Sequence, residues 1–187
     1  MDGTYRLEKD YKISVDIFRE GYRAYQKKYV YPKSCIFMGL FTLLALDFIY
    51  ASVREPDNYM SYLLVVVCFG FAIREWYNPR KIRRCLVESY AENPENVYRL
   101  SVGDGYVDIS TVSETVVENF DVPEDDGTEP EPPPEPTRIP LDEQFGILEY
   151  DEFFLLVYGK SVVYIIPAEN FTEEEKDTVR NLKSQES

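Results

Sequence analysis

Two long apolar runs dominate the hydropathy pattern of this chain. The first covers residues 35–53 with a single charged residue, Asp47, and the second covers residues 59–73 and extends to Tyr77. A helix needs about 20 mostly apolar residues to cross the hydrocarbon core of a bilayer, and aromatic residues flank both runs as they do at membrane interfaces. The pattern predicts a transmembrane helical hairpin over residues 34–78, because the rest of the chain is too short to bury two such helices.

The segment before the first run predicts an amphipathic helix over residues 9–29. Its aromatic and apolar side chains recur at spacings of three and four, which places them on one helical face. These residues are Tyr11, Val15, Phe18, Tyr22, Tyr25 and Tyr29. We expect this face to pack on the protein's own folded domain; the alternative place for it is the membrane surface. After the second run, residues 80–90 continue that helix until Asn93 and Pro94 break it.

Short β runs replace the helical pattern after residue 96. Residues 97–102 and 106–112 flank a Gly-Asp-Gly turn at 103–105, which predicts a β-hairpin. A phosphate-binding loop is the alternative interpretation of the turn, but neither a helix nor a Lys-Ser/Thr pair follows it. Residues 115–120 form a third β run.

The β pattern resumes at residues 144–149 and continues at 153–158 and 161–166. The continuous apolar character of residues 153–158 predicts a strand that is covered on both faces. Thr172 and Glu175 match a capping box, which predicts a final helix. Strands in a meander followed by one helix indicate a small antiparallel β-sheet domain with a C-terminal helix, which is pleckstrin-homology-like by analogy.

An acidic, proline-rich segment at residues 121–138 interrupts the β pattern. It holds six prolines and seven acidic residues, a composition that predicts an extended and solvated loop rather than a core or a ladder strand. The pairs Pro130/Pro133 and Pro133/Pro136 match the PxxP spacing that SH3-like domains bind. A plain spacer is the interpretation we prefer.

These patterns together predict an α+β membrane protein with four segments. Residues 1–33 hold an N-terminal strand and the amphipathic helix, and residues 34–78 hold the transmembrane hairpin. Residues 79–96 form a juxtamembrane helix and linker. Residues 97–187 form a cytoplasmic β domain that contains the acidic loop.

Charge is distributed unevenly along the chain. Residues 1–100 hold 15 Lys and Arg against 12 Asp and Glu, whereas residues 101–187 hold 5 against 22, within a net charge of −14. Because the acidic half repels phosphate backbones, we expect no nucleic-acid partner. The chain has no histidine and only three widely spaced cysteines, Cys35, Cys68 and Cys85. His-based catalysis is therefore excluded, and neither a disulfide framework, a metal site nor a cofactor is expected.

Basic residues flank the predicted hairpin on the side of both chain ends. They are Lys27, Lys28 and Lys33 before the first run and Arg80, Lys81, Arg83 and Arg84 after the second. The connecting loop has one basic residue, Arg54. Cytoplasmic flanks carry the excess of Lys and Arg, so the pattern predicts a two-span protein of the cell membrane with both termini in the cytoplasm. The first run starts near residue 35 without a cleavage pattern, which indicates a retained anchor rather than a signal peptide.

Asp47 is the acidic residue well inside the first apolar run. One interpretation is a contact for an ion or proton, or a polar lock between helices. The interpretation we prefer is that Asp47, a few residues from the outer end of the run, reaches the lipid headgroups.

The order of elements and a C-terminal stretch carry a resemblance to a known family. The order is a short strand at residues 4–7, a helix, two adjacent spans and a compact β domain. The stretch comprises Ile139-Pro140-Leu141-Asp142, residues 153–158, Ile165-Ile166-Pro167 and Asn170-Phe171 before an acidic helix. In these features the chain resembles the bacterial YcxB-like membrane proteins. Family members often have a basic residue where Ala168 stands, and the resemblance implies a membrane protein of uncharacterised function with no catalytic residues to transfer.

Three functional hypotheses follow. The preferred one is a membrane-anchored, non-enzymatic binding or regulatory protein, integral to the lipid bilayer, whose β domain contacts a protein partner. The alternative is an accessory or homo-oligomeric subunit of a small transport assembly that uses Asp47, and it needs several copies because two spans cannot enclose a pore. An enzyme is the least favoured, since the neighbouring acids Asp142/Glu143 and Asp151/Glu152 are better explained as turn and surface charges.

Overall fold

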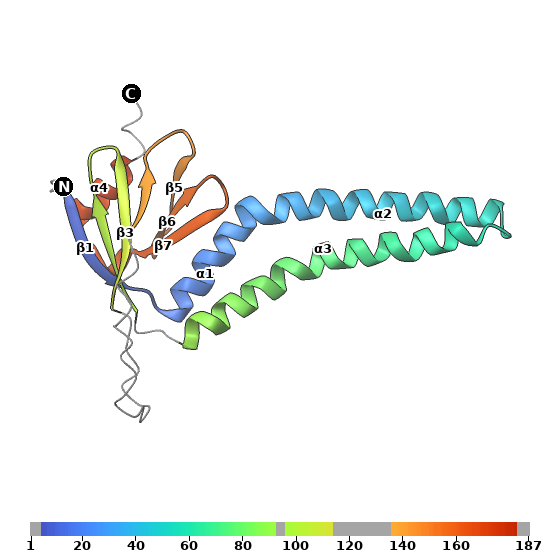
Figure 1. The fold of residues 1–187 in the computed structure, drawn as a ribbon, viewed down its shortest axis with the longest axis horizontal. Coiled ribbons are helices and arrows are strands. Elements are labelled where there is room, and N and C mark those ends of the chain that lie inside the picture. The colour runs from blue at the N-terminus through green and yellow to red at the C-terminus, as the bar shows by residue number, and fades with distance from the viewer. Residues whose placement is uncertain (1–4, 93–95, 114–135, 183–187) are drawn as a thin grey trace, which may run out of the picture. The chain divides into compact units, whose positions relative to one another are not determined.

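The computed structural model describes residues 5–92, 96–113 and 136–182 of the chain. The chain divides into two compact units (Figure 1). A helical unit covers Tyr22–Glu88, and a β unit combines Met1–Gly21 with Ser89–Ser187. The β unit is therefore built from both ends of the chain, and the helical unit is inserted between its first two strands.

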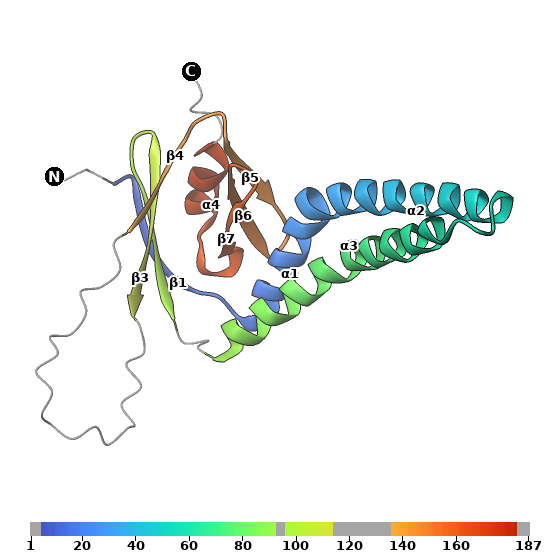
Figure 2. The same cartoon turned by 45° about the vertical axis from the view of Figure 1, so that its right-hand side comes forward.

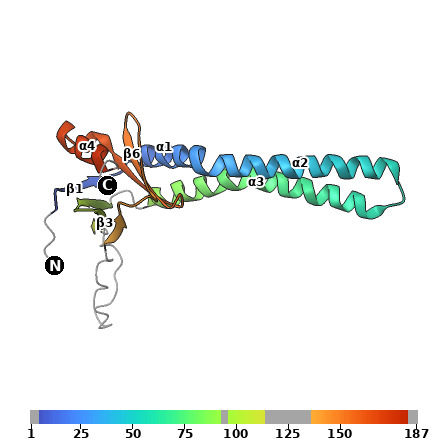
Figure 3. The same cartoon turned by 90° about the horizontal axis from the view of Figure 1, so that it is seen from above.

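Two long helices, α2 and α3, form the helical unit and confirm the two predicted apolar helices. They run antiparallel and side by side (Figures 1 and 3), and both are long and apolar enough to cross a membrane. The 24 residues of α2 extend about 36 Å at 1.5 Å per residue. The helices of the chain before the β domain are α1 (Val15–Tyr25), the π-helical turn η1 (Gln26–Val30), α2 (Tyr31–Arg54) and α3 (Tyr59–Glu92).

Small residues face the contact between α2 and α3. Ala45, Cys68 and Ala72 are buried there although most other side chains of the hairpin are exposed. Phe41 of α2 stacks on Phe71 of α3 with ring centroids 5.2 Å apart. Small side chains allow two helix backbones to approach closely, which is the packing typical of membrane helices.

The predicted continuation of the second apolar run is also confirmed. α3 passes through Pro79 without interruption and ends at Glu92, directly before the predicted breakers, which lie outside the described residues. Pro79 has no backbone N–H, so the carbonyl of Glu75 lacks its usual helical donor.

Two antiparallel sheets make up the β unit. The first has the strand order β1-β2-β3-β4 and the second has the order β5-β6-β7. The Gly-Asp-Gly hairpin is confirmed: β2 pairs with β3, and Gly105 adopts a φ of +79° that favours glycine. The strands are β1 (Leu7–Lys12), β2 (Val97–Val102), β3 (Tyr106–Ser113), β4 (Thr137–Pro140), β5 (Phe145–Glu149), β6 (Phe153–Tyr158) and β7 (Val162–Pro167).

The core of the β unit contains fully buried aliphatic and aromatic side chains from both sheets. Leu100 of the first sheet and Leu155 of the second are completely buried. The first five residues of β6 are all buried, which confirms the prediction of a strand covered on both faces. The helical segment of the β unit also packs closely, since a Cβ at Gly21 would lie 2.8 Å from the side chain of Ile165 on β7.

Helix α4 (Glu173–Arg180) bridges the two sheets, as Figure 2 shows. Glu175 accepts hydrogen bonds from Lys9 of β1 at 3.2 Å, and Arg180 donates to Glu149 of β5 at 2.6 Å. The predicted capping box is present, with Thr172 accepting from the Glu175 N–H and Glu175 accepting from the Thr172 N–H. This motif satisfies backbone donors at the helix start.

Two predictions of local structure are wrong. Residues 9–12 were expected in a helix, but they belong to β1, which begins at Leu7, the last residue of the strand expected at 4–7, and continues to Lys12. Pairing with β2 and the burial of Tyr11 beside Tyr98, with ring centroids 5.9 Å apart, outweigh the weak helical propensity of so short a segment. Residues 137–138 were assigned to the acidic loop but pair with β3; the rest of that loop up to residue 135, and the run at 115–120, lie outside the described residues.

Candidate functional site

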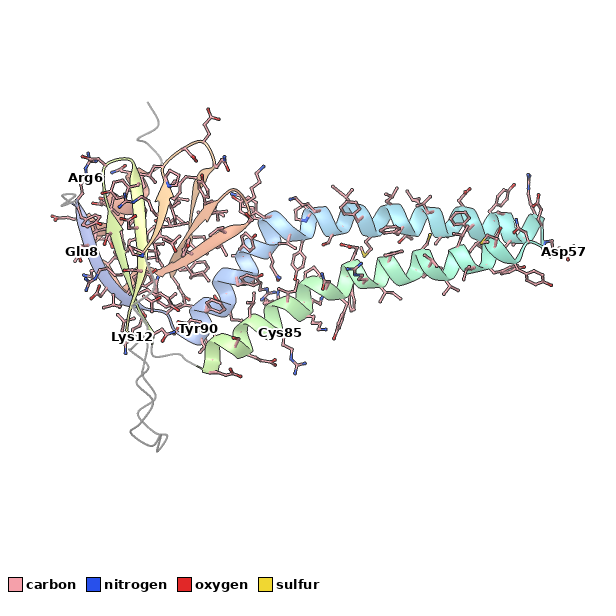
Figure 4. The ribbon with its side chains drawn as sticks, in the orientation of Figure 1. Arg6, Glu8, Lys12, Asp57, Cys85 and Tyr90 are labelled. Atoms are coloured by element: carbon pink, nitrogen blue, oxygen red, sulfur yellow. The ribbon has the colours of Figure 1, made fainter. Side chains whose placement is uncertain are left out.

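Large apolar side chains cover the outside of the helical unit. They point away from the α2–α3 contact along the length of both helices (Figure 4). Those that are more than half exposed include Ile36, Leu43, Leu46, Val53, Met60, Leu63, Val66 and Ile73. In water such a surface would be far larger than the apolar patches of ordinary soluble domains.

The basic residues predicted to set the membrane topology differ in their surroundings. Lys27, Lys28, Lys33, Lys81 and Arg84 are exposed. Arg84 forms an exposed ion pair with Glu88 one helical turn away, at 2.7 Å. Arg80, which is also exposed, and Arg83, which is half-buried, line a cavity. Two residues that were chosen only for their charge therefore belong to a shaped site.

The cavity lies in the helical unit at the end of the hairpin opposite the 55–58 turn. Its volume is about 430 Å³. Three guanidinium groups line it, those of Arg23 from α1 and of Arg80 and Arg83 from α3. The remaining lining residues are Tyr31, Ser34, Cys35, Met38, Glu75 and Trp76. Cationic, aromatic and apolar groups thus share one half-open cavity.

Arg83 is held in place by two polar side chains. Its Nη1 donates to the hydroxyl of Tyr31 at 3.2 Å and lies 3.5 Å from Oε1 of Gln26. Gln26 is itself only 1 % exposed, and its Nε2 donates to the carbonyl oxygen of Pro79 at 2.7 Å. The π-helical turn therefore turns a buried amide toward α3, where it orients the guanidinium of Arg83.

Arg80 is positioned by the only tryptophan of the chain. Its guanidinium carbon lies 4.2 Å from the ring centroid of Trp76, and its Nη1 donates to the Trp76 carbonyl oxygen. A guanidinium over an aromatic face keeps its charge and its outer N–H groups available.

The cavity carries an excess of positive charge. Within the residues that the structure describes, none of the three arginines forms an ion pair with a carboxylate. Among the described residues of the lining, Glu75 is the one acidic group. Three guanidinium groups against one carboxylate make the cavity suited to an anion, and to phosphate above all, which matches the N–H fork of arginine.

Asp47 lies apart from this cavity. Its side chain is exposed on α2, and it forms no hydrogen bond or ion pair with any residue in the described parts of the chain. The polar-lock interpretation therefore has no partner residue within the described parts of this chain, and the interpretation as a headgroup contact stays a prediction.

The β unit contains a separate polar network on its first sheet. Asp108 is buried, and Arg138 donates two hydrogen bonds to it, at 2.9 and 2.8 Å. Tyr5 also donates to Asp108, at 3.2 Å, and this hydrogen bond is the main cause that raises the pKa of Tyr5 above its usual value. The network satisfies a buried carboxylate and links β3 and β4 to the segment that precedes β1.

The sequence analysis missed Arg23, Gln26 and Glu75 as site residues. It considered Tyr31 and Trp76 only as members of the aromatic residues that flank the apolar runs. A buried glutamine among lysines and tyrosines is a weak signal, because the π-helical turn changes which residues share a face. The heptad relation of Trp76 and Arg83, with Arg80 between them, could have shown that these three side chains share one face of α3. Among the described residues, no group of three or more acidic or cysteine side chains could hold a metal ion.

The chain, with its helical hairpin and two-sheet β unit, was compared with known protein families, curated proteins and solved structures. No protein-family model, no curated protein and no solved structure matches the chain.

Proposed function

We propose that this chain is a membrane-anchored, non-enzymatic binding or regulatory protein of the YcxB-like type. In this proposal α2 and α3 span the cell membrane as a hairpin, and the β unit is a cytoplasmic interaction module. Four strands, three strands and a terminal helix, in that order, support a pleckstrin-homology-like fold for the module.

The exposed apolar surface of α2 and α3 is the observation that carries the proposal. Helices of a soluble protein hide one apolar face, but these two expose large apolar side chains on several faces. Basic residues stand at the two helix ends that lead to the β unit, whereas Glu55 and Asp57 stand at the connecting turn. This asymmetry supports an orientation with the turn outside the cell.

A labelling experiment tests the membrane topology. The three native cysteines are replaced by alanine, and a single cysteine is introduced by Asn58→Cys in the turn or by Glu174→Cys in α4. A membrane-impermeant maleimide should label the first variant in intact cells and the second only after permeabilisation. Labelling of the α4 position in intact cells would contradict the orientation, and loss of the chain from membranes in alkaline carbonate would contradict the span itself.

A crosslinking experiment tests the role of the β unit. The tagged full chain is crosslinked mildly through its lysines in native membranes, purified and analysed by mass spectrometry. We expect a stoichiometric partner linked to Lys160 or Lys176, which belong to the β unit. Recovery of partners linked only to the helical unit would contradict the β unit as the interaction module.

The exposed position of Asp47 supports a second candidate function, a homo-oligomeric or accessory transport subunit. Ionisable side chains at membrane depth usually pair with each other or face a water-filled cavity, and within the described residues Asp47 has no such partner in its own chain. Neighbouring copies would supply one. If Asp47→Asn leaves the oligomeric state in mild detergent unchanged, this candidate is eliminated.

A further inference from the structure

The cavity formed by α1, α2 and α3 has the chemistry of an anion site rather than of a helix-packing defect. It is lined by three guanidinium groups, and Gln26 and Tyr31 hold one of them, that of Arg83, in a defined position. Arg84, the next residue of α3, lies outside this lining and pairs with Glu88 on the exposed surface instead.

We propose that this cavity binds a phosphate group, either of an anionic lipid headgroup or of a soluble phosphate compound. Arg23, Arg80 and Arg83 would donate N–H groups to the phosphate oxygens from two sides of the cavity. Guanidinium groups bind phosphate through paired, charge-assisted hydrogen bonds, and basic pockets between membrane helices are known to hold acidic headgroups.

The lining also has apolar residues that could contact the glycerol backbone and acyl chains of a lipid. Met38 and Cys35 stand on the α2 side of the cavity, where the apolar surface of the hairpin begins. A headgroup bound by the arginines would place its glycerol backbone beside these residues and its acyl chains along α2. The lipid source depends on the proposed membrane span, whereas the phosphate chemistry does not.

Glu75 acts against the anion and so tunes the site. It is half-buried in the same lining and forms no ion pair among the described residues. Removing its charge should strengthen phosphate binding, while a cavity that held a cation would lose affinity by the same change.

Calorimetry with the purified full chain in neutral detergent micelles tests the proposal. Three probes are titrated: dihexanoyl-phosphatidic acid, dihexanoyl-phosphatidylcholine and inorganic phosphate. We expect saturable binding of phosphatidic acid at one site per chain, and no binding of phosphatidylcholine. Because Trp76 is the only tryptophan and lines the cavity, its fluorescence should change along the same binding curve.

Matched variants locate the binding. Arg23→Gln and Arg83→Gln should each raise the dissociation constant about tenfold or more, as the loss of a charge-assisted hydrogen bond predicts. Arg84→Gln is the control, because it removes the same charge from the neighbouring position of α3 but outside the cavity. Arg23 has no hydrogen-bond partner among the described residues, so Arg23→Gln should leave the thermal unfolding temperature unchanged. Glu75→Gln should lower the dissociation constant.

The results distinguish a lipid headgroup from a soluble phosphate compound as the ligand, and they show whether the cavity binds phosphate at all. Binding of phosphatidic acid without inorganic phosphate supports a lipid, and equal binding of inorganic phosphate with the same dependence on Arg23 supports a soluble compound. The proposal is overturned if neither phosphatidic acid nor inorganic phosphate binds saturably, or if phosphatidylcholine binds as well as phosphatidic acid. It is also overturned if Arg84→Gln weakens binding as much as Arg23→Gln. The cysteine-labelling experiment reports on the membrane span independently of these results.

Discussion

Leucine side chains have opposite surroundings in the two units of this protein. Leu155 of β6 is completely buried among side chains of the β unit, whereas Leu43 of α2 is 67 % exposed. In the β unit, apolar residues are removed from solvent by the protein itself. In the helical unit the same residue types remain uncovered by the chain, as the proposed membrane span requires. This difference supports the proposal that the two units have different surroundings, water for the β unit and lipid for the helical unit.

The largest expected effect uses this pair of leucines directly. Leu155→Ala should destabilise the β unit by about 2–5 kcal/mol, because it leaves a cavity in a close-packed core. Leu43→Ala, the matched change on the hairpin, should change the free energy of unfolding in detergent by less than about 1 kcal/mol. Denaturant unfolding of the full chain in micelles, followed by circular dichroism, measures both. Equal losses in the two variants would break the comparison.

A charge on the exposed apolar surface tests what that surface contacts. Val66→Lys on α3, where the valine is 69 % exposed, should reduce membrane integration at a cost of about 2.5–3.5 kcal/mol. Val162→Lys on β7, where the valine is 42 % exposed, should leave integration unchanged. The carbonate-resistant fraction of each variant is the measurement. If both variants stay in membranes as the natural chain does, α3 does not contact lipid at this position.

The buried Tyr11 should make the stability of the β unit depend on pH under alkaline conditions. Burial raises the pKa of Tyr11 in β1 well above its usual value of 10. The folded state therefore keeps a proton that the unfolded chain loses, so this stabilisation is complete below pH 10 and declines as the pH rises further. We expect the stability of the natural chain to fall above pH 10 by up to about 1.4 kcal/mol per pH unit more than that of Tyr11→Phe. If the free energy of unfolding of both proteins changes with pH in the same way, Tyr11 ionises as freely in the folded as in the unfolded chain and the prediction is wrong.

The smallest expected effect concerns the cap of α4. Thr172→Ala removes the side-chain acceptor of the capping box and should destabilise the β unit by about 1 kcal/mol. Thr178→Ala, in the interior of the same helix, serves as the control and should change stability by only a few tenths of a kcal/mol. Thermal unfolding of the two variants measures the difference. A loss at Thr178 as large as that at Thr172 would assign the effect to helix packing instead of capping.

Local patterns predicted the elements whose signals lie within a few neighbouring residues. The apolar run of β6, the Gly-Asp-Gly hairpin and the Thr172/Glu175 capping box each encode their structure in adjacent positions, and all three are confirmed. The segment at residues 9–12 was predicted wrongly because its structure depends on a strand about 90 residues away. Nothing in its own spacing of aromatic residues could reveal that partner.

The cavity is an even clearer case of a feature that local sequence patterns cannot reveal. Arg80 and Arg83 were predicted to be important for their charge, but the sequence offered no reason to join them with Arg23, which is 60 positions earlier than Arg83. The π-helical turn at Gln26 shifts the helical register, and the antiparallel return of α3 brings the arginines together. Only a chain folded back on itself creates a volume with a defined lining.

The amino-acid sequence by itself determined that this protein has two helices long and apolar enough to cross a membrane, a meander of β strands and a capped terminal helix. Hydrophobic periodicity and turn chemistry act over a few residues, so they can be recognised without a fold. The tertiary structure decided that β1 completes the first sheet, that α4 bridges both sheets and that three arginines meet around one cavity. These features depend on contacts between distant segments, whose energies are settled only when the whole chain has packed.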